Sequence, residues 1–164
     1  MNRIRMNRIG SQRRRGAAMV EFAIIMPVFL TLILGILELG KALQTSNIMT
    51  AAVREGGRLS AMDWEGLVPD DSDPNEKVED DIRNFLAASG IPPEAVDISI
   101  TSAEGADEGD DFDLNDPDNK LRLFRITVTV PFSAISTFPS HFMAGETVTA
   151  SLVFRSGRTT LSGQ

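Results

Sequence analysis

The chain has no cysteine and no tyrosine, and it has a single histidine among its 164 residues. The absence of cysteine excludes disulfide bridges, thiolate zinc sites, cysteine nucleophiles and lipoprotein acylation. With one histidine and no tyrosine, few side chains remain for general acid–base chemistry or for ligating a metal ion. The composition therefore argues against an enzyme, and we expect no catalytic residue, no cofactor and no metal site.

Charge is distributed unevenly along the chain. Residues 1–16 contain six arginines and no acid, whereas the segment 63–118 contains 19 acids against Lys77 and Arg83. The formal net charge of the whole chain, −7, hides this asymmetry. A basic tail that precedes an acidic body is typical of a chain whose tail faces a membrane or a polyanion.

A long apolar segment follows the basic tail and runs from Ala17 to Gly40. Within it, sixteen uncharged residues separate Glu21 from Glu38. At about 1.5 Å per residue, a helix over 17–40 is long enough to cross a hydrocarbon core of roughly 30 Å. A buried core helix is the alternative, but the chain has little other apolar mass with which to surround the segment.

The charges that flank the apolar segment predict its orientation. Lys and Arg stay on the cytoplasmic side of a membrane, so we expect residues 1–16 in the cytoplasm and the C-terminal domain in the periplasm or outside the cell. This role explains the arginines more economically than nucleic-acid binding does, and we expect no nucleic-acid partner. No A-x-A-like cleavage site follows Gly40. The helix is therefore expected to persist as a single-pass anchor in the cytoplasmic (inner) membrane.

The junction of the two parts places a glycine five residues before an acid and an aromatic residue, with basic residues in front: Gly16, Glu21 and Phe22, preceded by Arg13, Arg14 and Arg15. This arrangement resembles the processing site of type IV prepilins and pseudopilins. The resemblance implies that a prepilin peptidase cuts between Gly16 and Ala17 on the cytoplasmic side of the membrane. Glu21 would then be the fifth residue of the mature chain.

Elementary electrostatics gives Glu21 a role in assembly. A new α-amino group at a helix N-terminus is disfavoured by the helix dipole, and a carboxylate about 6 Å along the axis can neutralise the amine of a neighbouring subunit. Such a contact at 4 Å is worth roughly 4 kcal/mol before desolvation. We therefore expect Glu21 and Phe22 to act in assembly, the alternative being an interfacial Glu21 that stabilises its own helix. Pro27, inside the apolar run, is expected to kink the helix.

Further strings narrow the resemblance to one family. The N-terminal half carries GAAMVEFAIIMP at 16–27, ILELGK at 36–41 and AAVREGGR at 51–58. These strings resemble the TadE-like family, the pseudopilins of tight-adherence (Tad, Flp-pilus) systems. Looser likenesses occur at 128–133 and 147–155, and we recognise no resemblance in the segment 63–118. Where Gly57 stands, the family usually has alanine, so a double glycine could end or hinge the helix there.

Periodicity predicts a small helix and three strands in the exported part. Apolar residues at helical spacing predict a helix over 76–89, and alternation predicts strands at 96–100, 124–132 and 148–154. Each strand has one apolar face, which favours a small antiparallel sheet packed on a helix. The predicted fold is α+β and pilin-like, with a long N-terminal transmembrane helix. We expect three regions: the leader at 1–16, the extended helix at 17–62 and the acidic domain at 63–164.

The acidic loop Asp107–Asp118 partly resembles a calcium-binding loop. Asp111, Asp113 and Asn115 match the first, third and fifth positions of an EF-hand. Asp116 stands where glycine is needed, however, and Arg122 stands where the bidentate glutamate is needed. The loop fails as an EF-hand, which leaves an irregular calcium loop or a solvated, mobile loop. Trp64 is expected to be a core or interface residue, and His141 has no partners for a metal site.

The sequence thus predicts a minor pseudopilin of a Tad-type pilus that is a substrate of an enzyme and not an enzyme itself. Its expected partners are a prepilin peptidase, other pilin-like subunits with the assembly machinery, and the lipid bilayer. The alternative is an uncleaved single-pass membrane protein. Its acidic exported domain would bind calcium or another ligand.

Overall fold

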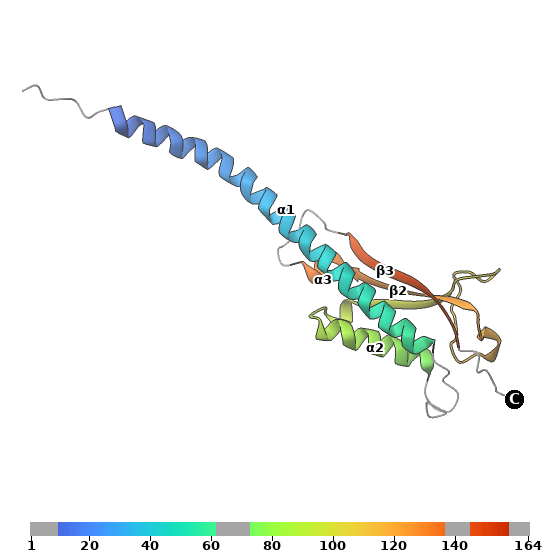
Figure 1. Ribbon diagram of the computed structural model, residues 1–164. Coiled ribbons are helices and arrows are strands. Elements are labelled where there is room, and N and C mark those ends of the chain that lie inside the picture. Colours follow the sequence, from blue (N-terminus) through green and yellow to red (C-terminus); the bar gives the residue numbers. More distant parts are fainter. Residues whose placement is uncertain (1–9, 62–72, 137–144, 158–164) are drawn as a thin grey trace, which may run out of the picture. The chain divides into compact units, whose positions relative to one another are not determined.

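The computed structural model describes residues 10–61, 73–136 and 145–157 (Figure 1). Its elements follow in the order α1 (Gly10–Ser60), α2 (Pro74–Ala88), η1 (Pro93–Ala95), β1 (Asp97–Ser102), η2 (Pro117–Asn119), β2 (Leu123–Pro131), α3 (Phe132–Ile135) and β3 (Thr147–Arg155). The predicted fold class is confirmed: a long apolar N-terminal helix precedes a small helix and a three-stranded antiparallel sheet. Trp64 and His141 lie outside the described residues.

Contacts divide the chain into two compact units, Met1–Leu39 and Gly40–Gln164. The boundary falls within α1, so the first unit contains the N-terminal part of that helix. The second unit contains the remaining part of the helix together with α2 and the sheet.

The sheet has the strand order β1-β2-β3, and both pairs are antiparallel. Ile100 of β1 lies opposite Ile126 of β2, which in turn lies opposite Leu152 of β3. Along β2 the even-numbered residues from Phe124 to Val130 are fully buried, while their odd-numbered neighbours are partly exposed. The alternation in the sequence therefore corresponds to one buried and one outward face of the sheet.

Two helices cover the buried face of the sheet (Figure 1). From α1 come Met49, Ala52 and Val53, and from α2 come Val78, Ile82 and Leu86, all of them buried in the same core as the inward residues of the strands. Burying such side chains is worth about 1.5–3 kcal/mol each. These contacts hold the C-terminal part of α1 against the rest of the second unit.

Helix α2 has well-defined ends that lie close to the predicted ones. The Asp73 carboxylate accepts a hydrogen bond from the Asn75 N–H at 2.9 Å, and Pro74 occupies the first turn, where its missing N–H does no harm. Gly90, with φ of 84°, follows the helix. The sequence placed this helix over 76–89, so the capping aspartate and proline extend it by two residues at the start.

The glycine pair of α1 neither ends nor hinges the helix, which continues to Ser60. A Cβ at Gly56 would lie 2.5 Å from Cδ1 of Ile82, and a Cβ at Gly57 would overlap the ring of Phe154. Both glycines therefore let α1 approach its neighbours closely, α2 at Gly56 and β3 at Gly57. The expectation that the double glycine could end or hinge the helix is therefore wrong, and the two glycines serve close packing instead.

Candidate functional site

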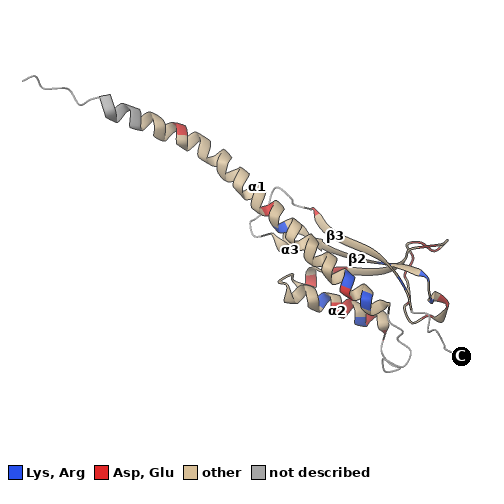
Figure 2. Ribbon diagram, viewed as in Figure 1, with Lys and Arg blue, Asp and Glu red and all other residues tan. Residues whose placement is uncertain are grey.

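The N-terminal part of α1 exposes large apolar side chains around its circumference. The exposed fraction is 75% for Met19, 60% for Phe22, 70% for Ile24 and 70% for Val28. The sequence has no charged residue between Glu21 and Glu38, and Figure 2 shows the corresponding uncharged stretch of α1 in tan. A continuous apolar helical surface of this kind is unusual for a soluble protein and marks a contact with lipid or with other apolar helices.

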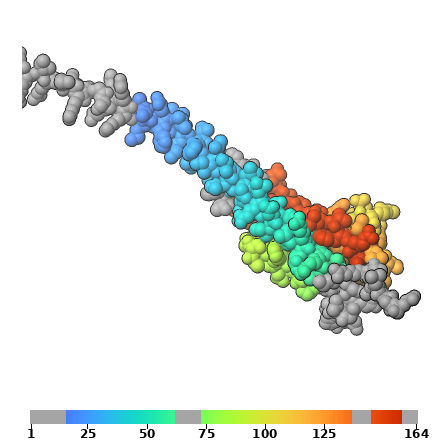
Figure 3. Space-filling model, viewed as in Figure 1, coloured from blue at the N-terminus to red at the C-terminus, as the bar shows by residue number. Residues whose placement is uncertain are grey.

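By length and composition, α1 contains one stretch able to cross a membrane. It lies within Gly16–Ser60, near the N-terminus, with a mean hydropathy of 2.5 in its most apolar window and none of that window buried. In the space-filling view of Figure 3, the side chains of the N-terminal part of α1, in blue, are visible on the face in view. A long apolar N-terminal helix suited to a membrane anchor is therefore present.

The residues of the predicted processing site all lie in this helix. Gly16, Ala17, Glu21 and Phe22 are helical and exposed. The backbone at Arg13, Arg14 and Arg15 is helical too, because α1 begins at Gly10. Nothing lies within 4 Å of the position where a Cβ at Gly16 would be. The peptide bond between Gly16 and Ala17 thus lies in a helical and exposed part of the chain.

Pro27 lies inside α1 without interrupting it. Because proline has no N–H, the carbonyl of Ala23 loses its intrahelical donor. The Thr31 hydroxyl donates to the carbonyl of Pro27 at 2.8 Å, which satisfies its own polar group within the helix. A hydroxyl that bonds back to the preceding turn is suited to an apolar environment.

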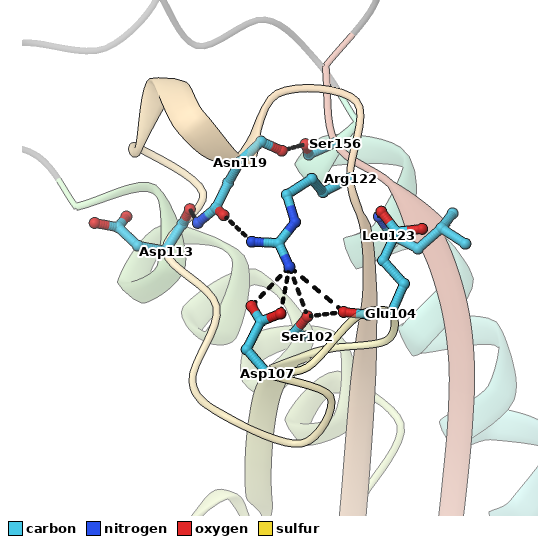
Figure 4. Close-up of polar contacts among 8 residues, drawn as sticks. All are labelled: Ser102, Glu104, Asp107, Asp113, Asn119, Arg122, Leu123 and Ser156. Carbon is cyan, nitrogen blue, oxygen red and sulfur yellow. Dashed lines mark hydrogen bonds and ion pairs between the residues drawn. The ribbon is translucent and has the colours of Figure 1, made fainter.

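The acidic loop is organised around one guanidinium group (Figure 4). The Arg122 Nη2 donates to both carboxylate oxygens of Asp107, at 2.7 and 2.6 Å, and its Nη1 donates to Oδ1 of Asn119 at 3.0 Å. Longer contacts of 3.4 Å join Nη2 to the Ser102 hydroxyl and to the Glu104 carbonyl. Arg122 therefore ties the start of the loop, near Asp107, to its end at Asn119.

These contacts shift two pKa values. The hydrogen bond from Arg122 lowers the pKa of the Asp107 carboxyl, and the same hydrogen bond raises the pKa of the Arg122 guanidinium. Elsewhere in the same unit, partial burial on α2 raises the pKa of Glu79, although nearby Arg83 opposes that shift. Asp107 is thus an ionised partner of Arg122 at neutral pH.

The loop is also anchored in the core and on α2. Phe112 is 2% exposed and stacks on Phe124 with 5.3 Å between ring centroids. The Asn75 amide donates to the Phe112 carbonyl at 2.6 Å and accepts from the Leu114 N–H at 2.9 Å. One expectation from the sequence was a solvated, mobile loop. The carboxylates of the loop are largely exposed to solvent, but its backbone is held to α2 and to the core at several points.

The calcium hypothesis gains no support from this geometry. Across 10–61, 73–136 and 145–157, no three His, Cys, Asp or Glu residues converge in a way that could hold a metal ion. The carboxylates of Asp113 and Asp116 instead accept hydrogen bonds from the N–H groups two residues further on, at 2.8 and 2.9 Å. Arg122, which takes the twelfth EF-hand position, supplies a positive charge to the loop.

Sequence reasoning noted Arg122 only as a departure from the calcium pattern and missed its structural role. The sequence did contain a signal. Arg122 stands where the last calcium-binding glutamate would be, shortly after the acids of the loop Asp107–Asp118, and its charge is suited to neutralise them. The pairing with Asp107 could not be read from spacing, because it depends on how the loop folds back onto the start of β2.

Comparison with known proteins gives one match. Residues 16–58 match the family described as TadE-like protein, which belongs to Tad pilus systems. No curated protein and no solved structure matches the chain. The matched segment begins at the glycine of the predicted processing site and ends beside the glycine pair of α1. The resemblance inferred from the sequence is thus confirmed for residues 16–58.

Proposed function

We propose that this chain is a minor pseudopilin of a Tad-type pilus system. Its basic leader stays in the cytoplasm, a prepilin peptidase cuts between Gly16 and Ala17, and the apolar part of α1 anchors the chain in the inner membrane. During assembly the same helix leaves the lipid and packs with the helices of other pilin-like subunits. The acidic α+β domain is then displayed on the outer side.

The observation that carries this proposal is the exposed apolar surface of α1 within a segment that matches the TadE-like family. Each large apolar side chain gains about 1.5–3 kcal/mol when it is removed from water. Over the many exposed side chains of this helix, that gain greatly exceeds the few kcal/mol by which a domain is stable. Lipid and neighbouring apolar helices are the two environments that supply the gain, and a pilus subunit uses them in turn.

The processing step requires the helix to open locally at Gly16. Glycine favours the helix less than alanine does, by about 1 kcal/mol, so it lowers the free energy needed to unwind the turn that contains the cleaved bond. Nothing lies within 4 Å of the Cβ position at Gly16, so within the described part of the chain no packed side chain opposes this opening. Cutting before the apolar run leaves the anchor intact.

After cleavage, Glu21 would be the fifth residue of the mature chain, and its carboxylate would lie within the apolar part of the helix. An acid within an apolar helix costs about 2.5–3.5 kcal/mol at the centre of a membrane and less near its edge. Pairing with the α-amino group of a neighbouring subunit removes that penalty when the helix enters a packed filament. Exposure of Glu21 on the helix surface fits such an intermolecular contact.

The N-terminus of the protein purified from membranes of its native host tests the proposal. Intact mass and N-terminal sequencing should give a chain that starts at Ala17. The matched variant Gly16→Ala should accumulate as the longer chain in the same membranes. A wild-type chain that keeps its leader beside an active peptidase would contradict the proposal and leave an uncleaved membrane anchor with an acidic domain.

A further inference from the structure

The two edges of the sheet, formed by β1 and β3, differ in how far other described parts of the chain cover them. The outer edge of β1 is covered by the acidic loop. The Phe112 N–H donates to the Ile100 carbonyl at 3.0 Å, the Ser102 N–H donates to the Asp110 carbonyl at 2.8 Å, and the Gly109 N–H donates to the Ser102 carbonyl at 3.0 Å. This edge is therefore closed to other strands along its second half.

The edge formed by β3 has no such cover within the described part of the chain. The Glu146 carbonyl accepts from the Phe132 N–H, and the Ser156 N–H donates to the Arg122 carbonyl, so even-numbered residues bond toward β2. In an antiparallel pair the alternate residues direct their main-chain groups away from the partner. The N–H and C=O groups of five residues thus point outward: Thr147, Thr149, Ser151, Val153 and Arg155.

Strand β3 also lacks the features that usually protect an edge. It is nine residues long, pairs with β2 without a bulge, and contains no proline and no lysine. Arg155, at its end, is the only charged residue. Beside the edge, the outward face carries hydroxyls that contact each other across the strands, Thr127 with Ser151 at 3.2 Å and Thr129 with Thr149 at 3.4 Å. Long, uncharged, unbroken edges of this kind pair readily with another strand.

A second copy of this chain does not suit the edge when both copies are anchored in one membrane and their helices pack side by side. Strand β3 and the Gly40–Ser60 part of α1 run in the same direction (Figure 1), and Gly57 at the end of the helix meets Phe154 at the end of the strand. Antiparallel pairing of two β3 strands would reverse one of the two helices. Parallel pairing of two β3 strands would keep the helix directions but place the two helices on opposite faces of the joined sheet. Pairing with a β1 strand, which runs parallel to β3, would keep both helices aligned, but the loop covers half of that edge.

We propose that the β3 edge binds an extended strand of a different membrane-anchored subunit, which adds to the sheet as a fourth strand. The inference rests on the proposed function, from which it takes the shared membrane of the two subunits and the packing of their helices. Main-chain hydrogen bonds to Thr149, Ser151 and Val153 would provide the affinity. The incoming strand should be uncharged along its length, with an acidic residue where it meets Arg155.

A photo-reactive residue tests the contact in the full chain, in membranes of the native host. Benzoyl-phenylalanine in place of Thr149 should cross-link to one other subunit that has its own apolar N-terminal helix, identified by mass spectrometry. The matched control carries the same group in place of Ser99, on the outward face of β1, roughly 10 Å from β3. A cross-link to another copy of this chain, an equal yield at Ser99, or no cross-link at Thr149 would overturn the proposal.

A second pair of variants distinguishes main-chain pairing at the β3 edge from side-chain contacts on the outward face of the sheet. Ser151→Pro removes an outward N–H and obstructs an incoming strand, yet it removes no hydrogen bond between β2 and β3. Ser151→Ala removes only the hydroxyl. The cross-link from position 149 should be lost with proline and kept with alanine, and loss with both would overturn edge pairing.

Should Ser151→Pro impair folding, as judged by thermal unfolding, Val153→Lys places a charge on the same edge and should also abolish the cross-link. Retention of the cross-link in Val153→Lys would overturn the proposal. The N-terminus is sequenced in the same samples. A chain that starts at Ala17 without a cross-link refutes the strand pairing alone, and a cross-link on a chain that keeps its leader refutes the processing alone.

Discussion

Glycines of α1 have opposite roles depending on what lies beside them. Gly57 faces the ring of Phe154, and the position that a Cβ would take is already filled, whereas nothing lies within 4 Å of the corresponding position at Gly40. The first glycine is required for packing, while the second only weakens the helix. Neither role can be inferred from the residue type or from its helical environment alone.

Gly57→Ala is therefore expected to destabilise the folded second unit by about 1–3 kcal/mol, because overpacking forces the ring of Phe154 or the helix to shift. Gly40→Ala should stabilise the same protein by up to about 1 kcal/mol, since alanine favours the helix and meets no neighbour. Thermal unfolding of the two full-length variants in detergent micelles measures both effects. Adding Phe154→Leu should restore part of the loss in Gly57→Ala, and the absence of any rescue would argue against the ring contact.

Glu21 is expected to act in assembly and not in insertion. Glu21→Gln removes the charge but keeps the size and polarity, so the helix should still enter the membrane and the leader should still be removed. Incorporation of the subunit into pili should fall strongly, because the α-amino group of a neighbour loses its counter-charge. The checks are the membrane fraction and the pilus fraction of cells that express the variant in place of the native copy. Wild-type incorporation of Glu21→Gln would remove this carboxylate from the mechanism.

At the scale of elements, the strands were the most predictable part of the molecule. Alternation located β2 and β3 to within one residue at each end, since a half-buried strand needs an apolar residue at every second position. The short helix α3 was missed, because Phe132 continues the apolar alternation of β2 and only the backbone turn after Pro131 ends the strand. Strand order and the closing of the β1 edge depend on long-range contacts that no local pattern contains.

One carboxyl of the acidic loop and one of α2 give the second unit a specific response to pH. The Asp107 pKa lies below its ordinary value of 3.8, so this carboxyl stabilises the folded state above that pH, and the stabilisation is lost as pH falls toward the lowered pKa. The Glu79 pKa lies above its ordinary value of 4.5, so the stabilisation from this group is fully present below pH 4.5 and is lost as pH rises through the raised pKa.

Acidification should therefore first raise stability slightly and then lower it below pH 3.8. Denaturant unfolding at a series of pH values measures the profile. Asp107→Asn should remove the loss on the acid side, and Glu79→Gln should remove the initial rise. An unchanged profile in Asp107→Asn would mean that the pair with Arg122 contributes nothing to the pH dependence.

At the scale of the whole molecule, the two halves of the sequence obey different constraints. The segment that matches the TadE-like family includes the exposed apolar part of α1 and ends where the helix packs on α2 and β3. The remainder carries most of the acids. The family likeness thus includes the part of α1 with the exposed apolar surface, while the second unit supplies the core that holds the C-terminal part of the helix.

The orientation of the whole chain can be measured directly because the protein has no native cysteine. Single cysteines introduced as Ser11→Cys and Thr149→Cys report the two sides of the membrane, in a Gly16→Ala background that keeps the leader attached. A membrane-impermeant maleimide added to intact spheroplasts should label position 149 and leave position 11 unlabelled, because arginines beside an apolar helix are expected to keep the leader in the cytoplasm. After lysis both positions should react, which confirms that the cysteine at position 11 is accessible and was protected only by the membrane. Labelling of position 11 in intact spheroplasts would reverse the topology, and would place the Gly16–Ala17 bond on the side opposite to the one where the proposed cleavage takes place.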